Sequence, residues 1–235
     1  MITFDPMRIT RRRALSGIAA GGAALALARS PLRAAQSKDP LPRTRDYVVA
    51  LVRAHPAVDP RSRPVQKIEP AIPPPDPKSS PDNALVFDHF VGDLHLRYVF
   101  EDPSFMLALR MRDLKRLGVT RDELPTLVVT NYRRLYPKVS VAWPERWLGV
   151  LTNGGELEPC TLLDGAFWQN QQKAFGGDLI AAVPSANEVY FTPREPKQNI
   201  ELLKHLAILQ YEKAGKRAVS RTVFAWRFFR WEVLA

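Results

Sequence analysis

The stretch Asp93-Leu94-His95-Leu96-Arg97-Tyr98-Val99-Phe100 decides the fold class, because apolar and polar residues alternate along it. The apolar set on one face is Leu94, Leu96, Tyr98 and Phe100, and the polar set on the other is Asp93, His95 and Arg97. Successive side chains of a strand point to opposite faces, so the pattern predicts a half-buried β-strand whose polar face is solvated.

Helices and pairs of strands follow one another after this strand. Thr120 and Glu123 form a capping box before a helix that Pro137 ends, and Pro125 predicts an irregular first turn. Asp164 caps a second helix, which glycines at 176–177 stop. The other expected elements are strands at 147–151, 157–163, 179–183, 188–192 and 222–234, and a helix at 199–211. Helices that lie between hairpins indicate an α+β class, here a single domain with a largely antiparallel sheet.

Two segments precede this domain. Residues 41–54 are predicted as a short helix that Pro56 ends, because apolar residues recur there at helical spacing. Between Pro56 and Pro81 the chain holds nine prolines, which predict a semi-rigid spacer with an edge strand at 65–69; a proline-rich docking site is the alternative. The expected organisation is a leader at 1–34, a helix and spacer at 35–83, and the α+β domain at 84–235.

The leader has the pattern of a cleavable export signal. Arg11 and Arg12 precede residues 17–28, an uncharged run rich in Ala, Gly and Leu. Paired arginines before a short apolar run are typical of signals that the twin-arginine translocase reads. We therefore predict a periplasmic or secreted protein, with the leader removed after Ala28 or after Ala34.

The leader also changes the meaning of the net charge of +10. Its six arginines and one aspartate supply half of that charge, so we predict no nucleic-acid partner for the mature chain. No apolar run reaches the ~20 residues of a membrane-spanning helix, so we predict no transmembrane segment in the mature chain. Cys160 is the single cysteine, which excludes an intrachain disulfide.

Short motifs through residues 84–235 resemble one family when they are taken in order. They are Gly92-Asp93-Leu94, Arg97-Tyr98-Val99-Phe100-Glu101-Asp102-Pro103, Asp113-Leu114, Leu117-Gly118-Val119, Asp122-Glu123-Leu124, Asn131, Leu162-Leu163-Asp164, Trp168, Gly176-Gly177-Asp178, Ala182-Val183-Pro184 and Trp231-Glu232-Val233. This set resembles the YtpQ-like family of bacterial proteins, a domain of unknown function. The resemblance supports the fold class and implies no catalytic residue. The chain departs from the family at Ala186-Asn187, where Arg-Asp is usual, and at Phe228-Phe229, where the closing hairpin usually turns at Asp-Gly.

Candidate metal ligands are few. The one cluster with suitable side chains is Asp88, His89, Asp93 and His95. Asp93 and His95 share a strand face, but a tight site needs three or four donors, and the other histidines lie far away in sequence. We predict neither a metal nor another cofactor.

Catalysis has little support in the sequence. Cys160 is expected to be buried and inert, because no histidine lies near it in sequence to activate its thiol. The alternative function is a hydrolase-type enzyme with a polar cleft built from Asp93, His95, Glu156 and Glu158, since paired carboxylates can act as acid and base.

Aromatic and basic residues interleave in two regions. They are Tyr132, Arg133, Arg134, Tyr136, Trp143, Arg146 and Trp147 in the middle, and Arg221, Phe224, Trp226, Arg227, Phe228, Phe229, Arg230 and Trp231 near the C-terminus. Strand alternation would place Phe224, Trp226 and Phe228 on one face and Arg227, Phe229 and Trp231 on the other, so both faces would be partly apolar. We predict that Arg227, Arg230, Trp226 and Phe228 bind an anionic envelope glycan, a lipid head group or a protein. Trp231 is expected to be structural.

These patterns favour an exported, non-catalytic binding or interaction module of the cell envelope over an enzyme. A core face around which the arginines extend is the competing interpretation of the C-terminal region.

Overall fold

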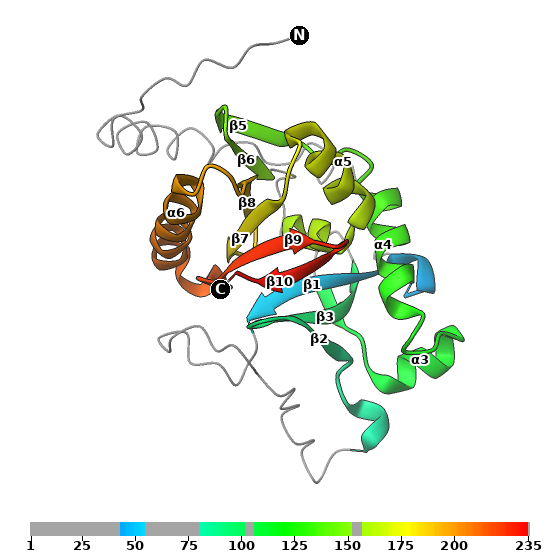
Figure 1. The fold of residues 1–235 in the computed structure, drawn as a ribbon. Coiled ribbons are helices and arrows are strands. Elements are labelled where there is room, and N and C mark those ends of the chain that lie inside the picture. The colour runs from blue at the N-terminus through cyan, green and yellow to red at the C-terminus, as the bar shows by residue number, and fades with distance from the viewer. Residues whose placement is uncertain (1–42, 55–79, 102–105, 152–156, 235) are drawn as a thin grey trace.

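A computed structural model describes residues 43–54, 80–101, 106–151 and 157–234. The predicted leader with Arg11 and Arg12, the expected strand at 65–69 and Glu156 lie outside the described residues. The described residues form an α+β domain with helices between antiparallel strands, which confirms the predicted class (Figure 1).

The strands form two sheets instead of one. The first has the order β1-β3-β2, and the short β4 pairs with the end of β3; the strands are β1 Val48–Ala54, β2 Phe87–Val91, β3 Leu94–Glu101 and β4 Met106–Ala108. The second has the order β10-β9-β7-β8-β6-β5. Its strands are β5 Val141–Glu145, β6 Leu148–Leu151, β7 Leu179–Ser185, β8 Glu188–Pro193, β9 Val223–Arg227 and β10 Arg230–Val233.

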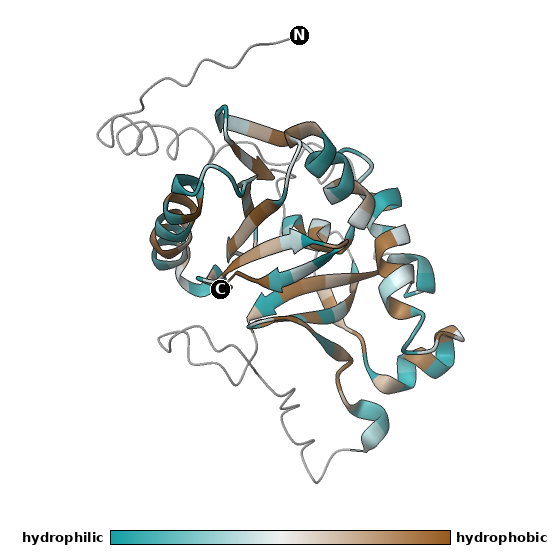
Figure 2. Cartoon of the chain, viewed as in Figure 1, coloured by the Kyte–Doolittle hydropathy of each residue, from teal (hydrophilic) through white to brown (hydrophobic). Residues whose placement is uncertain are grey.

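The helices cover these sheets. They are α3 Met111–Leu117, α4 Leu124–Leu135, α5 Gly165–Phe175 and α6 Gln198–Ala214, with short 3-10 helices η2 Arg45–Tyr47, η3 Pro81–Asn83, η4 Glu158–Leu163 and η5 Gly215–Arg217. Helix α6 packs on the second sheet, and its teal and brown bands in Figure 2 are those of an amphipathic helix. Among the helices that the structure describes, none is both long and apolar enough to cross a membrane.

One apolar core joins the two sheets. It contains alternate residues of β1 and β3, including Val52 and Leu96, together with Trp168 of α5 and Phe191 and Phe224 of the second sheet. Helix α6 covers the opposite face of the second sheet, and a smaller cluster with Cys160 covers the opposite face of β1. The central strands of the second sheet, β6, β7, β8 and β9, are therefore covered on both faces.

The second half of the segment predicted as a helix at 41–54 is the strand β1. Residues Val48 to Val52 are all buried, and Val48 pairs with Phe100 while Ala54 pairs with Leu94. A strand with both faces covered is a continuous apolar run, which periodicity does not distinguish from a helix. The described fold therefore includes β1, which precedes residues 55–79 in the chain, and does not begin at residue 84.

On the edge away from β3, β1 pairs with no other described strand. The carbonyl groups of three alternate residues along this edge accept hydrogen bonds from side chains. Asn131 Nδ2 donates to Val48 at 2.8 Å, Cys160 Sγ donates to Ala50, and Arg53 Nη1 donates to Val52 at 3.0 Å. These backbone acceptors are thus satisfied without a neighbouring strand.

The segment predicted as a strand at 157–163 is the 3-10 helix η4. Pro159 has no amide donor for a strand ladder, and residues 158–162 are all buried, so no alternation of exposure exists. The predicted helix ends are confirmed. Asp164 accepts a hydrogen bond from Phe167 N at 3.1 Å, and Gly176 ends α5 with a φ of 73°.

The start of α4 is irregular, as Pro125 predicts. Glu123 Oε2 accepts from Thr120 N at 2.7 Å, which completes one half of the capping box, but the helix itself begins at Leu124. The helix ends at Leu135, before Pro137.

Candidate binding site at the C-terminal hairpin

The body of the β9–β10 hairpin belongs to the core. Trp231 pairs with Trp226 across the hairpin and is 8% exposed. Its Nε1 donates to the Leu162 carbonyl at 2.9 Å, and its ring centroid lies 4.8 Å from that of Trp168. These large buried rings fix the hairpin against η4 and α5.

The hairpin turns through Phe228 and Phe229, whose φ angles are 49° and 63°. Two-residue turns with positive φ at both positions normally hold Asn-Gly, because a larger side chain crowds the left-handed backbone. Phe228 is 81% exposed and Phe229 is 71% exposed, the largest values among the described large apolar residues. The tip therefore combines backbone strain with two rings that are mostly in solvent.

Two arginines lie directly behind the rings. Arg227 and Arg230 are opposite each other, and Arg227 Nε donates to Asp178 Oδ2 at 2.9 Å. Arg194 lies 4.0 Å from the same carboxylate, and Arg230 Nε donates to Glu232 Oε1 at 2.9 Å. Like charges opposite each other destabilise a hairpin, and the two carboxylates offset this repulsion. Three arginines share two carboxylates, so one positive charge remains in excess.

The structure separates the four predicted binding residues. Phe228 and Arg230 are exposed at the tip, and Arg227 is partly exposed. Trp226 is 3% exposed and lies in the core, which corrects its assignment to the surface. The turn interrupts the alternation, so Trp226 and Trp231 share a face. Trp231 is buried, consistent with the structural role predicted for it.

Phe229 is a tip residue that the sequence interpretation did not select. Its signal is positional: Phe228-Phe229 stands where two strand-like runs must turn back, and neither residue favours a turn. The hairpin register places both rings beyond the paired strands.

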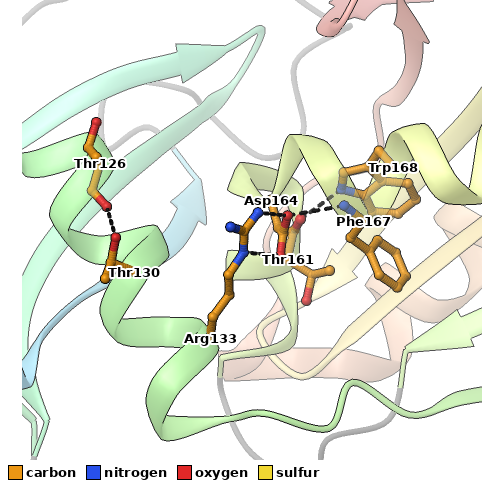
Figure 3. A network of polar contacts seen from close by, with 7 residues as sticks. All are labelled: Thr126, Thr130, Arg133, Thr161, Asp164, Phe167 and Trp168. Atoms are coloured by element: carbon orange, nitrogen blue, oxygen red, sulfur yellow. Dashed lines mark hydrogen bonds and ion pairs between the residues drawn. The ribbon is translucent and has the colours of Figure 1, made fainter.

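Arg133, in the middle basic-aromatic region, serves the fold. Figure 3 shows Arg133 of α4 directed at Asp164, with Nε and Nη2 donating to the carboxylate at 2.8 Å and 2.5 Å. Burial alone would raise the pKa of Asp164, but hydrogen bonds from Arg133 and the Phe167 amide outweigh it and lower that pKa. Trp168 Nε1 donates to the Thr161 carbonyl at 2.7 Å in the same network. These contacts tie α4, η4 and α5 together.

Residues of the cluster considered as candidate metal ligands make other contacts. Asp88 accepts hydrogen bonds from Arg121 Nε at 2.9 Å and from Tyr98 Oη at 2.8 Å, and a His89 ring nitrogen lies 3.0 Å from the Gly92 carbonyl oxygen. Within the described ranges, no group of three or more His, Cys, Asp or Glu side chains could hold a metal ion.

The polar residues of the hydrolase alternative lie in different surroundings. Both carboxylate oxygens of Asp93 accept from Ser220 Oγ at 2.8 Å, and burial raises the pKa of Asp93. His95 is 2% exposed, so the polar face of β3 is not solvated there as predicted. Glu158 lies in η4 and is 1% exposed, which corrects its placement on an exposed strand. Since Glu156 lies outside the described residues, the hydrolase alternative stays a prediction.

Cys160 is buried, and charged side chains act on it. Burial raises the pKa of its thiol far above the ordinary value, and the charges of Arg53, Glu101 and Glu158 also act on it. The sequence interpretation selected neither Arg53, the one charged residue of β1, nor Glu101 at the end of β3. Cys160 is buried and its thiol stays protonated, in agreement with the prediction of an inert cysteine.

The charged group near Cys160 and the Asp93 carboxylate are separate sites. Cys160 Sγ donates to the Ala50 carbonyl, and Ala50 pairs with Tyr98, five residues along β3 from Asp93. Five residues of strand span about 16 Å. Asp93 and Glu158 therefore do not line one cleft among the described residues.

Comparison of the chain with protein-family models, with curated proteins and with solved structures finds no match. The resemblance to the YtpQ-like family stays a prediction. The strained, exposed tip of the C-terminal hairpin is the strongest candidate site, on the basis of its own geometry.

Proposed function

We propose that the chain is an exported binding module of the cell envelope and that its contact surface is the tip of the β9–β10 hairpin. The observation that carries this proposal is the pair of exposed phenylalanines, Phe228 and Phe229, in left-handed backbone. A turn optimised for folding alone would hold Asn-Gly. Because the rings are mostly in solvent, their benefit lies outside the fold.

The charges behind the rings indicate the class of ligand. Arg227 and Arg230 provide guanidinium groups, and the Arg230 side chain is 72% exposed. A ligand that offers both an apolar region and anionic groups would engage rings and arginines together. Anionic envelope components have this character.

Binding to envelope material tests the proposal. The full chain should co-sediment with isolated envelopes, and the double substitution Phe228→Asn with Phe229→Gly should weaken binding by about tenfold or more, because aromatic contacts commonly dominate affinity. Ile208→Gln is the matched control, since Ile208 is an exposed apolar residue on α6. Equal binding by the tip variant and the control would contradict the proposal.

Export is the second part of the proposal, and Arg11 and Arg12 before the apolar run at 17–28 support it. Residues 1–40 fused to a reporter that is active only after folded export should give activity that depends on the twin-arginine translocase. Arg11→Lys with Arg12→Lys should abolish this activity, because the receptor reads the arginine pair. Unchanged export by the lysine variant would overturn this part.

A further inference from the structure

We infer that the ligand of the hairpin tip is an anionic lipid surface, into which Phe228 and Phe229 insert while the arginines behind them bind lipid phosphates. This inference rests on the proposed function and names its ligand. Its basis is the size, shape and charge of the tip.

The tip is too small for a stable protein interface of its own. Each aromatic ring buries about 150–250 Å² at most, whereas a standard protein interface buries about 800 Å² on each partner. The tip is also convex, because Phe228 and Phe229 are the only two residues between β9 and β10. A lipid surface deforms around a projecting ring and needs no matching groove.

The two arginines lie just behind the rings, where lipid phosphates would be when the rings insert. Arg227 and Arg230 flank the two rings in sequence and are opposite each other in the hairpin. When the rings lie at the boundary of the acyl chains, the long arginine side chains extend toward the phosphates. Guanidinium groups bind phosphate oxygens through paired hydrogen bonds.

The net charge of the tip has the sign that an anionic surface attracts. Asp178 and Glu232 hold the arginines in the free protein, but Arg194 beside Asp178 leaves one positive charge in excess. Attraction between such a tip and anionic lipids should therefore weaken as salt is added.

The body of the hairpin holds the tip in place before it meets a membrane. Trp231 is fixed by its hydrogen bond to the Leu162 carbonyl and by its contact with Trp168. The rings therefore project from a rigid support, and binding requires little ordering of the chain.

A fluorescent probe at the tip tests this inference directly. Cys160 is the only cysteine and is buried, so Phe229→Cys introduces the one accessible thiol of the described domain for an environment-sensitive dye. Vesicles of phosphatidylglycerol and phosphatidylcholine in equal parts should raise and blue-shift its emission, and vesicles of phosphatidylcholine alone should do so much less. The same dye on Glu201→Cys of α6, whose side chain is 76% exposed, should not respond. This control separates tip insertion from binding through the leader.

Vesicle binding by the tip variants completes the test. Phe228→Asn with Phe229→Gly should lower vesicle affinity by about tenfold or more, whereas Ile208→Gln should not change it. Binding without a response of the dye at position 229, or equal responses to both lipids, would overturn the inference. Tip-dependent binding to lipid-free envelope glycan or to a protein, without binding to vesicles, would overturn it while the proposed function stands. If the tip substitutions weaken neither binding to vesicles nor binding to envelope material, both the inference and the proposed function are overturned.

Discussion

Among the described hairpins with two-residue turns, β2–β3 and β9–β10 have left-handed backbone in the turn, and the two turns differ in what determines the residue there. In the β2–β3 turn, Gly92 has a φ of 55°, and a Cβ there would lie 2.7 Å from Val233 Cγ2 and 3.1 Å from the Phe224 ring. In the β9–β10 turn, Phe228 and Phe229 have the same kind of backbone but project into solvent. Packing requires glycine in the first turn, whereas nothing in the described fold requires phenylalanine in the second.

The difference shows why a residue other than glycine in left-handed backbone needs an explanation. Such a residue has a conformational cost, which either packing or binding must offset. Gly118 and Gly176 also have positive φ, at 63° and 73°, with nothing within 4 Å of a Cβ. At those helix ends, the chain uses the residue with the lowest conformational cost. At the hairpin tip it does not, and this contrast supports our proposal that the tip binds a ligand.

The largest change in stability should come from a substitution in the body of the β9–β10 hairpin. Trp231→Ala removes a buried ring and leaves the Leu162 carbonyl without its donor, so the free energy of unfolding should fall by about 3–5 kcal/mol. Urea unfolding of the variant and of the parent chain measures this. A small loss would show that the hairpin body is not part of the core, and the contrast between body and tip would fail.

The second effect concerns the packed turn. Gly92→Ala adds a Cβ against Val233 in left-handed backbone, and should destabilise the fold by about 2–4 kcal/mol. Gly118→Ala is the matched control, because it carries the backbone cost without a steric clash. If the two variants lose the same stability, packing does not select Gly92. Adding Val233→Ala to Gly92→Ala should restore part of the loss.

The third substitution should stabilise the fold, in contrast to the first two. Phe228→Asn with Phe229→Gly relieves the left-handed strain and should raise the free energy of unfolding by about 1–2 kcal/mol. The midpoint of thermal unfolding, measured for this variant and for the parent chain, tests this prediction. A lower midpoint would mean that the phenylalanines stabilise the fold, and the argument for a tip selected by binding would be lost.

The smallest effect on stability belongs to the arginines. Arg227→Gln and Arg230→Gln should each change the free energy of unfolding by no more than about 0.5 kcal/mol, because surface ion pairs contribute little. The same variants should bind envelope material more weakly and with less dependence on salt. Unfolding caused by Arg→Gln, together with tolerance of Trp231→Ala, would reverse the roles that we assign.

The sequence predicts the elements whose signals are local. Alternation locates β3, and capping residues such as Asp164 and Gly176 locate the ends of α5. The sequence predicts a helix at 41–54, whereas residues 48–54 form β1, because the deciding feature is pairing with β3, whose partner residues lie 40 to 52 positions further along the chain. The division into two sheets likewise depends on which distant strands pair, and no local sequence pattern predicts that pairing.

The sequence predicts only part of the candidate site, because no local signal marks the position of the turn. Arg227, Arg230 and Phe228 were selected from their composition, and the structure places them at or next to the tip. Trp226 was assigned wrongly because alternation was continued through a turn that no Gly or Asn marks. Phe229 was left out for that reason too.

The side-chain hydrogen bonds along the outer edge of β1 also affect whether copies of this chain can aggregate at high concentration. An open strand edge is a template on which a strand of another molecule can add, and repeated addition leads to aggregates. Asn131, Cys160 and Arg53 occupy the carbonyls that an added strand would need, and α4 and η4 pack against β1. Copies of the domain therefore cannot extend one another through this edge, and the first sheet ends at β1.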